Sequence, residues 1–192
     1  MKRIVIFASG NGSNAENLIR FFHNRDNVSV IQVLTNNPHA KVINRCNTLK
    51  ISCLSFNRAA LYSTNDVLNI LKNNNPDLIV LAGFLWKFPD NILNTFPNKV
   101  INIHPALLPN YGGKGMYGMH VHEAVVANKE TETGITIHYV NENYDEGAVI
   151  FQAKCDVSRS DSTEDVAAKI HKLEMEHFPQ VVDKLLLEET RI

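Results

Sequence analysis

The stretch IVIFASGNGSN, residues 4–14, decides the fold. It begins with a continuous apolar run, Ile4 to Ala8, which is typical of a strand buried on both faces of a parallel sheet. Gly10 and Gly12 follow at once, and helical spacing of apolar residues starts after them. The stretch therefore predicts a buried strand, a tight glycine turn and a helix that begins at the turn.

The same alternation of strand and helix continues through the first hundred residues. Apolar runs predict further strands at residues 28–34, 51–56, 78–82 and 100–103. Helical spacing predicts helices at residues 14–23, 40–49, 61–73 and 89–96. This alternation predicts a parallel sheet with helices on both faces and right-handed crossovers.

The pattern changes after residue 104. Residues 111–118 are rich in glycine and predict a loop, and residues 120–127 predict a helix. Two alternating runs, 134–140 and 148–155, predict an antiparallel hairpin. We therefore expect a doubly wound α/β fold with a mostly parallel sheet, an antiparallel C-terminal hairpin and a final long helix.

The final helix should begin at a cap formed by Ser162-Thr163-Glu164-Asp165. Pro179 lies inside its apolar pattern, so we expect a kink there or the start of a second segment. No repeat or linker interrupts the sequence, and residues 1–192 are expected to form a single domain.

Composition narrows the class of protein. The chain has 192 residues, 44% of them hydrophobic, and a net charge of −1, which excludes intrinsic disorder as the main state and argues against a nucleic-acid binder. The apolar run near the N-terminus is too short for a signal peptide or a membrane span. Three cysteines without a C-x-x-C pair favour a reducing compartment, so we expect a cytoplasmic protein.

The glycine turn is a candidate phosphate site. A helix N-terminus offers unpaired N–H groups and the positive end of the helix dipole, and Ser13 and Asn14 can add side-chain donors. A simple tight turn with a Ser or Asn cap is the alternative. The spacing Gly10-x-Gly12-x-x-Ala15 also fits a dinucleotide fingerprint, but residues 35–37 lack the acid that would hold the ribose. A phosphomonoester is therefore favoured over NAD.

Asn102, His104 and Asp145 are candidate catalytic residues. Alternation along the strand at 100–103 places Asn102 and His104 on one side, where both can donate to a developing oxyanion. Asp145, in the hairpin loop, is expected to raise the pKa of His104 and to accept a proton from an attacking amine. Local backbone hydrogen bonds and a plain turn are the alternative. His120-x-His122 would share a face only on a strand, so no metal site is expected.

These segments together resemble the phosphoribosylglycinamide formyltransferase family, the folate-dependent transferases of purine synthesis. The resemblance extends from about Ile4 to Pro179. It rests on the ordered set SGNGSN (9–14), LAGF (81–84), NIHPALLP (102–109), residues 134–140, Asp145-x-Gly147 and Gln152-Ala153.

The resemblance implies transfer of a formyl group from 10-formyltetrahydrofolate, as co-substrate, to the amine of glycinamide ribonucleotide. It implies no metal. It assigns catalysis to Asn102, His104 and Asp145, and the ribonucleotide phosphate and ribose to Gly12, Ser13, Asn14 and Glu174. It assigns the folate to Leu85, Trp86, Lys87, Phe88, Asn102, Asn141, Glu142, Asn143 and Tyr144.

The chain departs from the family pattern in three places. The run Leu85-Trp86-Lys87-Phe88 differs from the usual Met-Arg-Ile-Leu type, so backbone groups are expected to bind the pterin. A family arginine near residues 62–64 has no counterpart, and the segment 111–119 is longer and richer in glycine, as in a lid or a surface loop.

Other functions remain open at this point. They are a 10-formyltetrahydrofolate deformylase, a formyltransferase acting on methionyl-tRNA, and a non-catalytic nucleotide-binding module. The expected partners are small-molecule substrates, with no nucleic acid or membrane, and a homodimer is one open oligomeric state.

Overall fold

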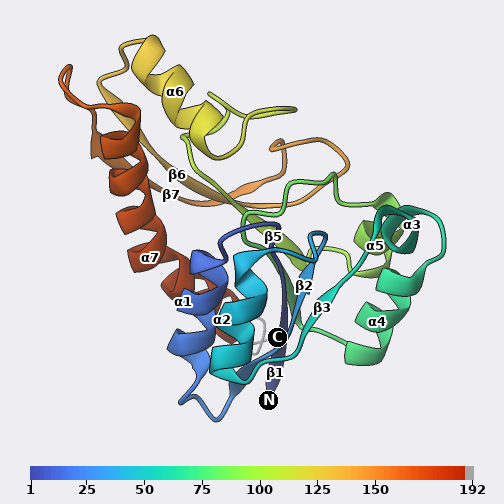
Figure 1. Ribbon diagram of the computed structural model, residues 1–192. Coiled ribbons are helices and arrows are strands. Elements are labelled where there is room, and N and C mark those ends of the chain that lie inside the picture. The colour runs from blue at the N-terminus through green and yellow to red at the C-terminus, as the bar shows by residue number, and fades with distance from the viewer. Residues whose placement is uncertain (189–192) are drawn as a thin grey trace.

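The computed structural model describes residues 1–188 (Figure 1). Within this part of the chain, seven strands form one sheet in the order β3-β2-β1-β4-β5-β6-β7. The strands are β1 (Lys2–Phe7), β2 (Val28–Thr35), β3 (Cys53–Ser55), β4 (Leu78–Leu81), β5 (Val100–His104), β6 (Glu132–Tyr139) and β7 (Val149–Asp156). The helices are α1 (Ser13–Phe22), α2 (Lys41–Leu49), α3 (Arg58–Tyr62), α4 (Asp66–Asn74), α5 (Asp90–Thr95), α6 (Met119–Ala127) and α7 (Thr163–Glu188).

The pairing of the strands confirms the expected doubly wound fold. Strands β1 to β5 pair in parallel, and β5–β6 and β6–β7 pair antiparallel, which is the predicted hairpin. Strand β1 lies inside the sheet. Strands β2 and β3 are added on one side of it, and β4 and the later strands are added on its other side. Ligands of such sheets bind beyond the carboxyl ends of the strands at this switch point.

Helices cover both faces of the sheet. Helices α1, α2, α6 and α7 pack on one face, and α3, α4 and α5 pack on the other (Figure 1). Residues of β1 alternate between these two cores, with Ile4 and Ile6 in the first and Val5 and Phe7 in the second, all four fully buried. Burial on both faces explains why β1 is apolar at every position from Ile4 to Phe7.

The segment 61–73 was expected to be one helix, and that prediction is wrong. Two helices, α3 and α4, occupy this region. The side chain of Asn57 accepts a hydrogen bond from the N–H of Ala60 and caps α3. Asn65 then adopts a left-handed conformation with φ 57° at the start of α4. A left-handed residue cannot continue a right-handed helix, so the chain breaks here despite the continuous apolar spacing.

The final helix begins as predicted and continues as one element through Pro179. Ser162 Oγ accepts from the N–H of Asp165, and the Asp165 carboxylate accepts from the N–H of Ser162, which is a reciprocal cap. No second segment begins at Pro179, which lies inside a single α7. Phe178 and Val182 are buried on either side of it, and packing of this helix face keeps α7 continuous. None of the described helices has the length and apolar content needed to span a membrane.

Candidate active site

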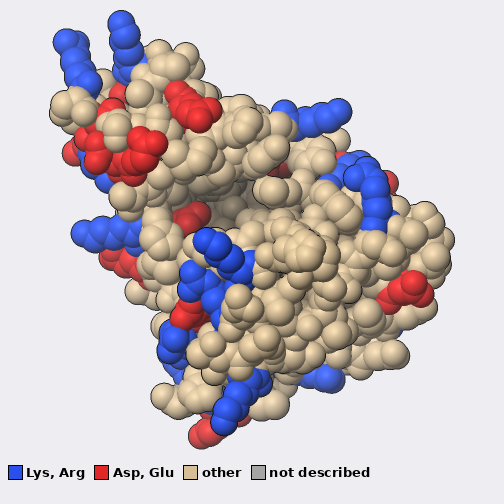
Figure 2. Space-filling view, viewed as in Figure 1, with Lys and Arg blue, Asp and Glu red and all other residues tan. Residues whose placement is uncertain are grey.

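A cavity of about 850 Å³ opens at the carboxyl ends of β1, β4 and β5. Figure 2 shows a hollow near the middle of this face, bordered mostly by uncharged side chains. Its walls come from residues 10–14, 81–88, 102–105 and 113–119, from the hairpin loop before β7, and from α7. Segments far apart in the sequence therefore meet at the switch point of the sheet.

The cavity brings together all but one of the predicted site residues. The exception is Glu142, which is exposed and does not line the cavity. Oδ1 of Asn141 accepts from the N–H of Asn143 at 3.0 Å, and this turn directs the residue between them away from the cavity. Glu142 is therefore the one residue of the predicted set that does not line this cavity.

The glycine turn leads into a helix whose first N–H groups are free of side-chain caps. Gly12 has φ 74°, and a Cβ added there would lie 2.4 Å from the side chain of Val42. No side chain caps α1, so the N–H groups of its first turn have no partner within the helix. These donors lie at the cavity wall formed by Ser13 and Asn14, and they suit an anion.

Neighbouring loops hold the glycine turn in place. The N–H of Ser9 donates to the carbonyl of Gly83 at 3.0 Å, and the N–H of Leu85 donates to Ser9 Oγ at 2.9 Å. Nε of Arg45 donates to the carbonyl of Asn11 at 2.7 Å. The turn is thus fixed from β4 on one side and from α2 on the other.

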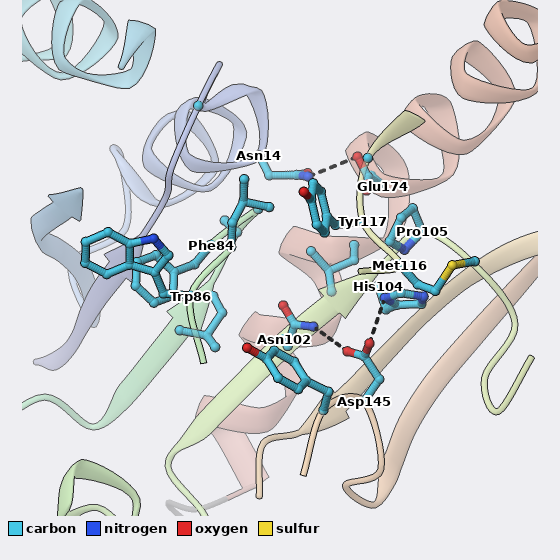
Figure 3. A pocket seen from close by; sticks show the side chains of 18 of the residues that line it. Asn14, Phe84, Trp86, Asn102, His104, Pro105, Met116, Tyr117, Asp145 and Glu174 are labelled. Atoms are coloured by element: carbon cyan, nitrogen blue, oxygen red, sulfur yellow. Dashed lines mark hydrogen bonds and ion pairs between the residues drawn. The ribbon is translucent and has the colours of Figure 1, made fainter. Parts of the chain in front are cut away.

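Asn14 and Glu174 join the glycine turn to the last helix. Nδ2 of Asn14 donates to Oε2 of Glu174 at 3.0 Å (Figure 3). Oδ1 of Asn14 is buried without a hydrogen-bond partner in the described part of the chain. Glu174 also lies 3.7 Å from Nδ1 of His171, and the contact raises the pKa of that histidine. The carboxylate of Glu174 therefore has a fixed position on the cavity wall.

The three predicted catalytic residues meet at the end of β5. Oδ2 of Asp145 lies 3.5 Å from Nδ1 of His104, and Oδ1 of Asp145 lies 3.5 Å from Nδ2 of Asn102 (Figure 3). Asp145 comes from the loop between β6 and β7, which the antiparallel pairing of β5 and β6 brings alongside. The arrangement places two side-chain nitrogens around one carboxylate.

Two further contacts at this group were not expected from the sequence. His138 Nδ1 donates to the carbonyl of Tyr139 at 2.8 Å, and its Nε2 lies 3.2 Å from Nδ2 of Asn102. Nε2 of His104 donates to the carbonyl of Tyr111, also at 2.8 Å. His138 pairs with Asn102 across the sheet, and only the strand register reveals this.

Burial has the largest effect on the pKa of His104. Desolvation lowers its pKa, and the charge of Asp145 and the hydrogen bond to Tyr111 raise it by less. Asp145 acts on this pKa in the expected direction, but burial outweighs it, so the pKa of His104 lies below its ordinary value in the free site. The reason is that the ring is only 3% exposed, and removing an ion from water disfavours the charged form.

Asp145 is held as a carboxylate in an unusual backbone conformation. Burial acts to raise its pKa, but the hydrogen bond of His138, the charge of His104 and the N–H of Gly113 together lower it. The N–H of Gly113 lies 2.9 Å from Oδ2. Asp145 has φ 58°, a conformation that persists only where the surroundings enforce it and that is common at functional sites.

An aromatic wall forms the other side of the cavity. Phe84, Trp86 and Phe88 line it, and the ring of Trp86 packs against Phe56 and Tyr62 at centroid distances of 6.2 Å. The guanidinium of Arg58 lies 5.5 Å from the Trp86 ring. This wall offers a flat, largely apolar surface of the kind that an aromatic ligand needs.

The part of the chain that the structure describes contains no cluster of side chains that could bind a metal ion. Among residues 1–188, no three His, Cys, Asp or Glu side chains are placed to hold an ion together. His120 and His122 lie on α6, where the first is exposed and the second is buried.

Comparison with known proteins points to one family. The sequence pattern described as formyl transferase matches residues 2–182. The chain is 34% identical over 193 residues to the phosphoribosylglycinamide formyltransferase of Bacillus subtilis, covering 97% of this chain and 95% of that protein. It is also 34% identical over 185 residues to the chloroplastic phosphoribosylglycinamide formyltransferase of Arabidopsis thaliana, and it spans 63% of that protein's length.

A solved structure agrees with these sequence matches. The glycinamide ribonucleotide transformylase 1 of Geobacillus kaustophilus superposes with a TM-score of 0.87 at 31% identity, covering 97% of this chain and 99% of that one.

Proposed function

The chain belongs to the formyl transferase family, and on that premise we propose that it transfers the formyl group of 10-formyltetrahydrofolate to the amine of glycinamide ribonucleotide in purine biosynthesis. A folate-derived formyl donor follows from the family. One observation supports the proposal most directly. The uncapped start of α1 and the group of Asn102, His104 and Asp145 line the same cavity.

The ribonucleotide binds along the wall formed by α1 and α7. Its phosphate accepts hydrogen bonds from the first N–H groups of α1, at Gly12, Ser13 and Asn14, where the helix dipole favours an anion. Its ribose lies toward Glu174, whose carboxylate Asn14 holds at 3.0 Å. This placement directs the substrate amine toward the end of β5.

The folate binds against the aromatic wall. Leu85, Trp86, Lys87 and Phe88 form one side of this region, and Asn141, Asn143 and Tyr144 form the other. Backbone groups of these two loops are available to the pterin, and the aromatic side chains provide apolar contact. Holding both substrates in one cavity makes the attack effectively intramolecular, which lowers the barrier by up to about 7–11 kcal/mol.

The substrate amine attacks the formyl carbon directly. A new C–N bond forms, and the carbonyl electron pair moves to oxygen and creates a tetrahedral oxyanion. His104 and Asn102 donate to that oxygen. The Nδ2 group of Asn102 is available because its 3.5 Å contact with Asp145 is long and can be exchanged for the oxyanion.

Asp145 organises the proton transfers. Its lowered pKa keeps it ionised, so it can accept the proton that the amine loses, directly or through water. The intermediate then collapses, and the bond from the formyl carbon to the folate nitrogen breaks. That nitrogen leaves as an amine after taking up a proton, so the step needs no oxidant and no covalent enzyme intermediate.

A turnover assay tests the proposal. A 10-formyl folate and glycinamide ribonucleotide are supplied together, and each is omitted in turn while folate absorbance is followed. Turnover that requires both supports the transferase. Folate consumption without the ribonucleotide would instead identify a deformylase, and nucleotide binding without turnover would identify a non-catalytic module.

Four further properties belong to this proposal. Residues 1–192 act as one domain, the ligands are small molecules and not nucleic acid, the protein works in the cytoplasm, and a homodimer is compatible with the site.

A further inference from the structure

His122, on α6, is a buried side chain that the mechanism above does not use. It is only 6% exposed, yet it lines the same cavity as the catalytic group. Its Nδ1 has no hydrogen-bond partner among the residues that the structure describes. Most buried polar atoms are hydrogen-bonded, and an unpaired one destabilises a protein, so this imidazole needs an explanation.

The position of His122 relates it to both ends of the nucleotide site. Helix α6 packs against α7, and the charges of Glu174 and His104 both act on the His122 ring. Glu174 contacts Asn14 beside the glycine turn, and His104 lies at the end of β5. A ligand group near His122 therefore lies between the phosphate end of the site and the point of formyl transfer.

The protonation of His122 narrows the kind of group that it can bind. Burial lowers its pKa, Glu174 acts in the opposite direction, and the charge of His104 lowers it further. The ring is therefore neutral near pH 7, with one N–H donor and one acceptor nitrogen. Either nitrogen of a neutral ring suits a hydroxyl group, which can accept from an N–H or donate to a bare nitrogen, whereas a phosphate is bound best by a cation or by N–H donors alone.

We propose that the imidazole of His122 binds a ribose hydroxyl of the nucleotide substrate, and that its hydrogen bonding is completed only when the nucleotide is present. Rotation of the ring about χ2 brings either nitrogen to the cavity side. The inference deepens the proposed function and rests on it for the identity of the nucleotide. It assigns to α6 a part of the binding site that the sequence motifs do not include.

His122→Leu tests the inference, because it replaces the imidazole by an apolar side chain of similar size. The free variant should be as stable as the wild type or melt a few degrees higher, since an unpaired polar group has been removed. Its Kd for glycinamide ribonucleotide, measured by calorimetric titration, should rise about tenfold, as expected for the loss of one good hydrogen bond. Its Kd for inorganic phosphate should stay within about twofold of the wild-type value, because the helix N-terminus is unchanged.

Two further variants control the comparison. His23→Leu removes an exposed histidine outside the cavity and should change neither affinity. His122→Gln keeps a donor and an acceptor and should bind the nucleotide with intermediate affinity. If His122→Leu does not fold, the nucleotide-to-phosphate affinity ratio of His122→Gln decides the question, and an unchanged ratio overturns the inference.

The outcomes separate this inference from the proposed function. An unchanged nucleotide affinity in a folded His122→Leu protein overturns the role of His122 alone. Wild-type protein that binds the ribonucleotide but transfers no formyl group overturns the proposed function and leaves the role of His122 standing. Wild-type protein that does not bind the ribonucleotide overturns both.

Discussion

Nε2 of His104 donates a hydrogen bond to the main-chain carbonyl of Tyr111, 2.8 Å away. The other ring nitrogen, Nδ1, lies 3.5 Å from the Asp145 carboxylate, so both nitrogens face acceptors that belong to the protein. Tyr111 has φ 56° and begins the glycine-rich loop. In the free site His104 is therefore oriented by this loop, and an oxyanion must replace one of these contacts to receive a hydrogen bond.

Replacing His104 by Ala should remove the main donor to that oxyanion. We expect kcat to fall by about 10²- to 10⁴-fold, the usual contribution of a general acid, with the far-UV spectrum unchanged. His23→Ala, at an exposed position outside the cavity, is the matched control for losing a histidine. Near-normal turnover in the folded His104→Ala protein would rule out this mechanism.

Asp145→Asn should lower the pKa of His104 further. The carboxylate is the largest of the influences that raise this pKa, and the amide removes its charge. An NMR titration of the His104 ring in both proteins measures the effect. A His104 pKa that does not move would show that Asp145 acts only through proton transfer or positioning.

Gly12→Ala should weaken both the fold and nucleotide binding. The added Cβ would lie 2.4 Å from Val42 at a residue with φ 74°, and overpacking of this kind costs about 1–3 kcal/mol. Denaturant unfolding and a nucleotide titration measure the two effects. Gly10→Ala is the matched control in the same turn, since its Cβ would meet nothing within 4 Å. Equal losses in both variants would contradict the steric explanation.

Trp86 should report folate binding by its fluorescence. It is the one tryptophan in the sequence and it lines the cavity, so its emission has a single source. A reduced folate should quench or shift that emission, while glycinamide ribonucleotide, bound on the α1 and α7 side, should leave it nearly unchanged. The opposite response to the two ligands would reverse their assigned places in the cavity.

Buried histidines should make the protein sensitive to mild acid. The pKa values of His104 and His122 are both lowered in the folded state, so below about pH 6.5 the unfolded chain binds more protons at these rings. Their contribution to stability is present at higher pH and is lost as the pH falls through this region. Melting temperatures between pH 7.5 and 5 should therefore fall less steeply in His122→Leu than in the wild type. Equal slopes would mean that His122 titrates alike in the folded and unfolded chains.

Local sequence patterns were sufficient to predict the strand, glycine turn and helix at residues 4–14, the hairpin before α7 and the cap at Ser162. These features follow from local rules, because apolar periodicity, glycine turns and caps act over a few neighbouring residues. Most predicted site residues also line the cavity, since the carboxyl ends of parallel strands meet at one edge of the sheet.

The interactions among these residues follow from the three-dimensional packing and could not be read from the sequence. The break between α3 and α4, the pairing of His138 with Asn102, and the contact of Tyr111 with His104 all depend on partners or turns that periodicity does not reveal. The lowered pKa of His104 and the unpartnered Nδ1 of His122 depend on burial, which is set by the whole fold. Sequence patterns place chemical groups at the same edge of the sheet, but long-range packing and desolvation decide which groups touch and which of them carry charge.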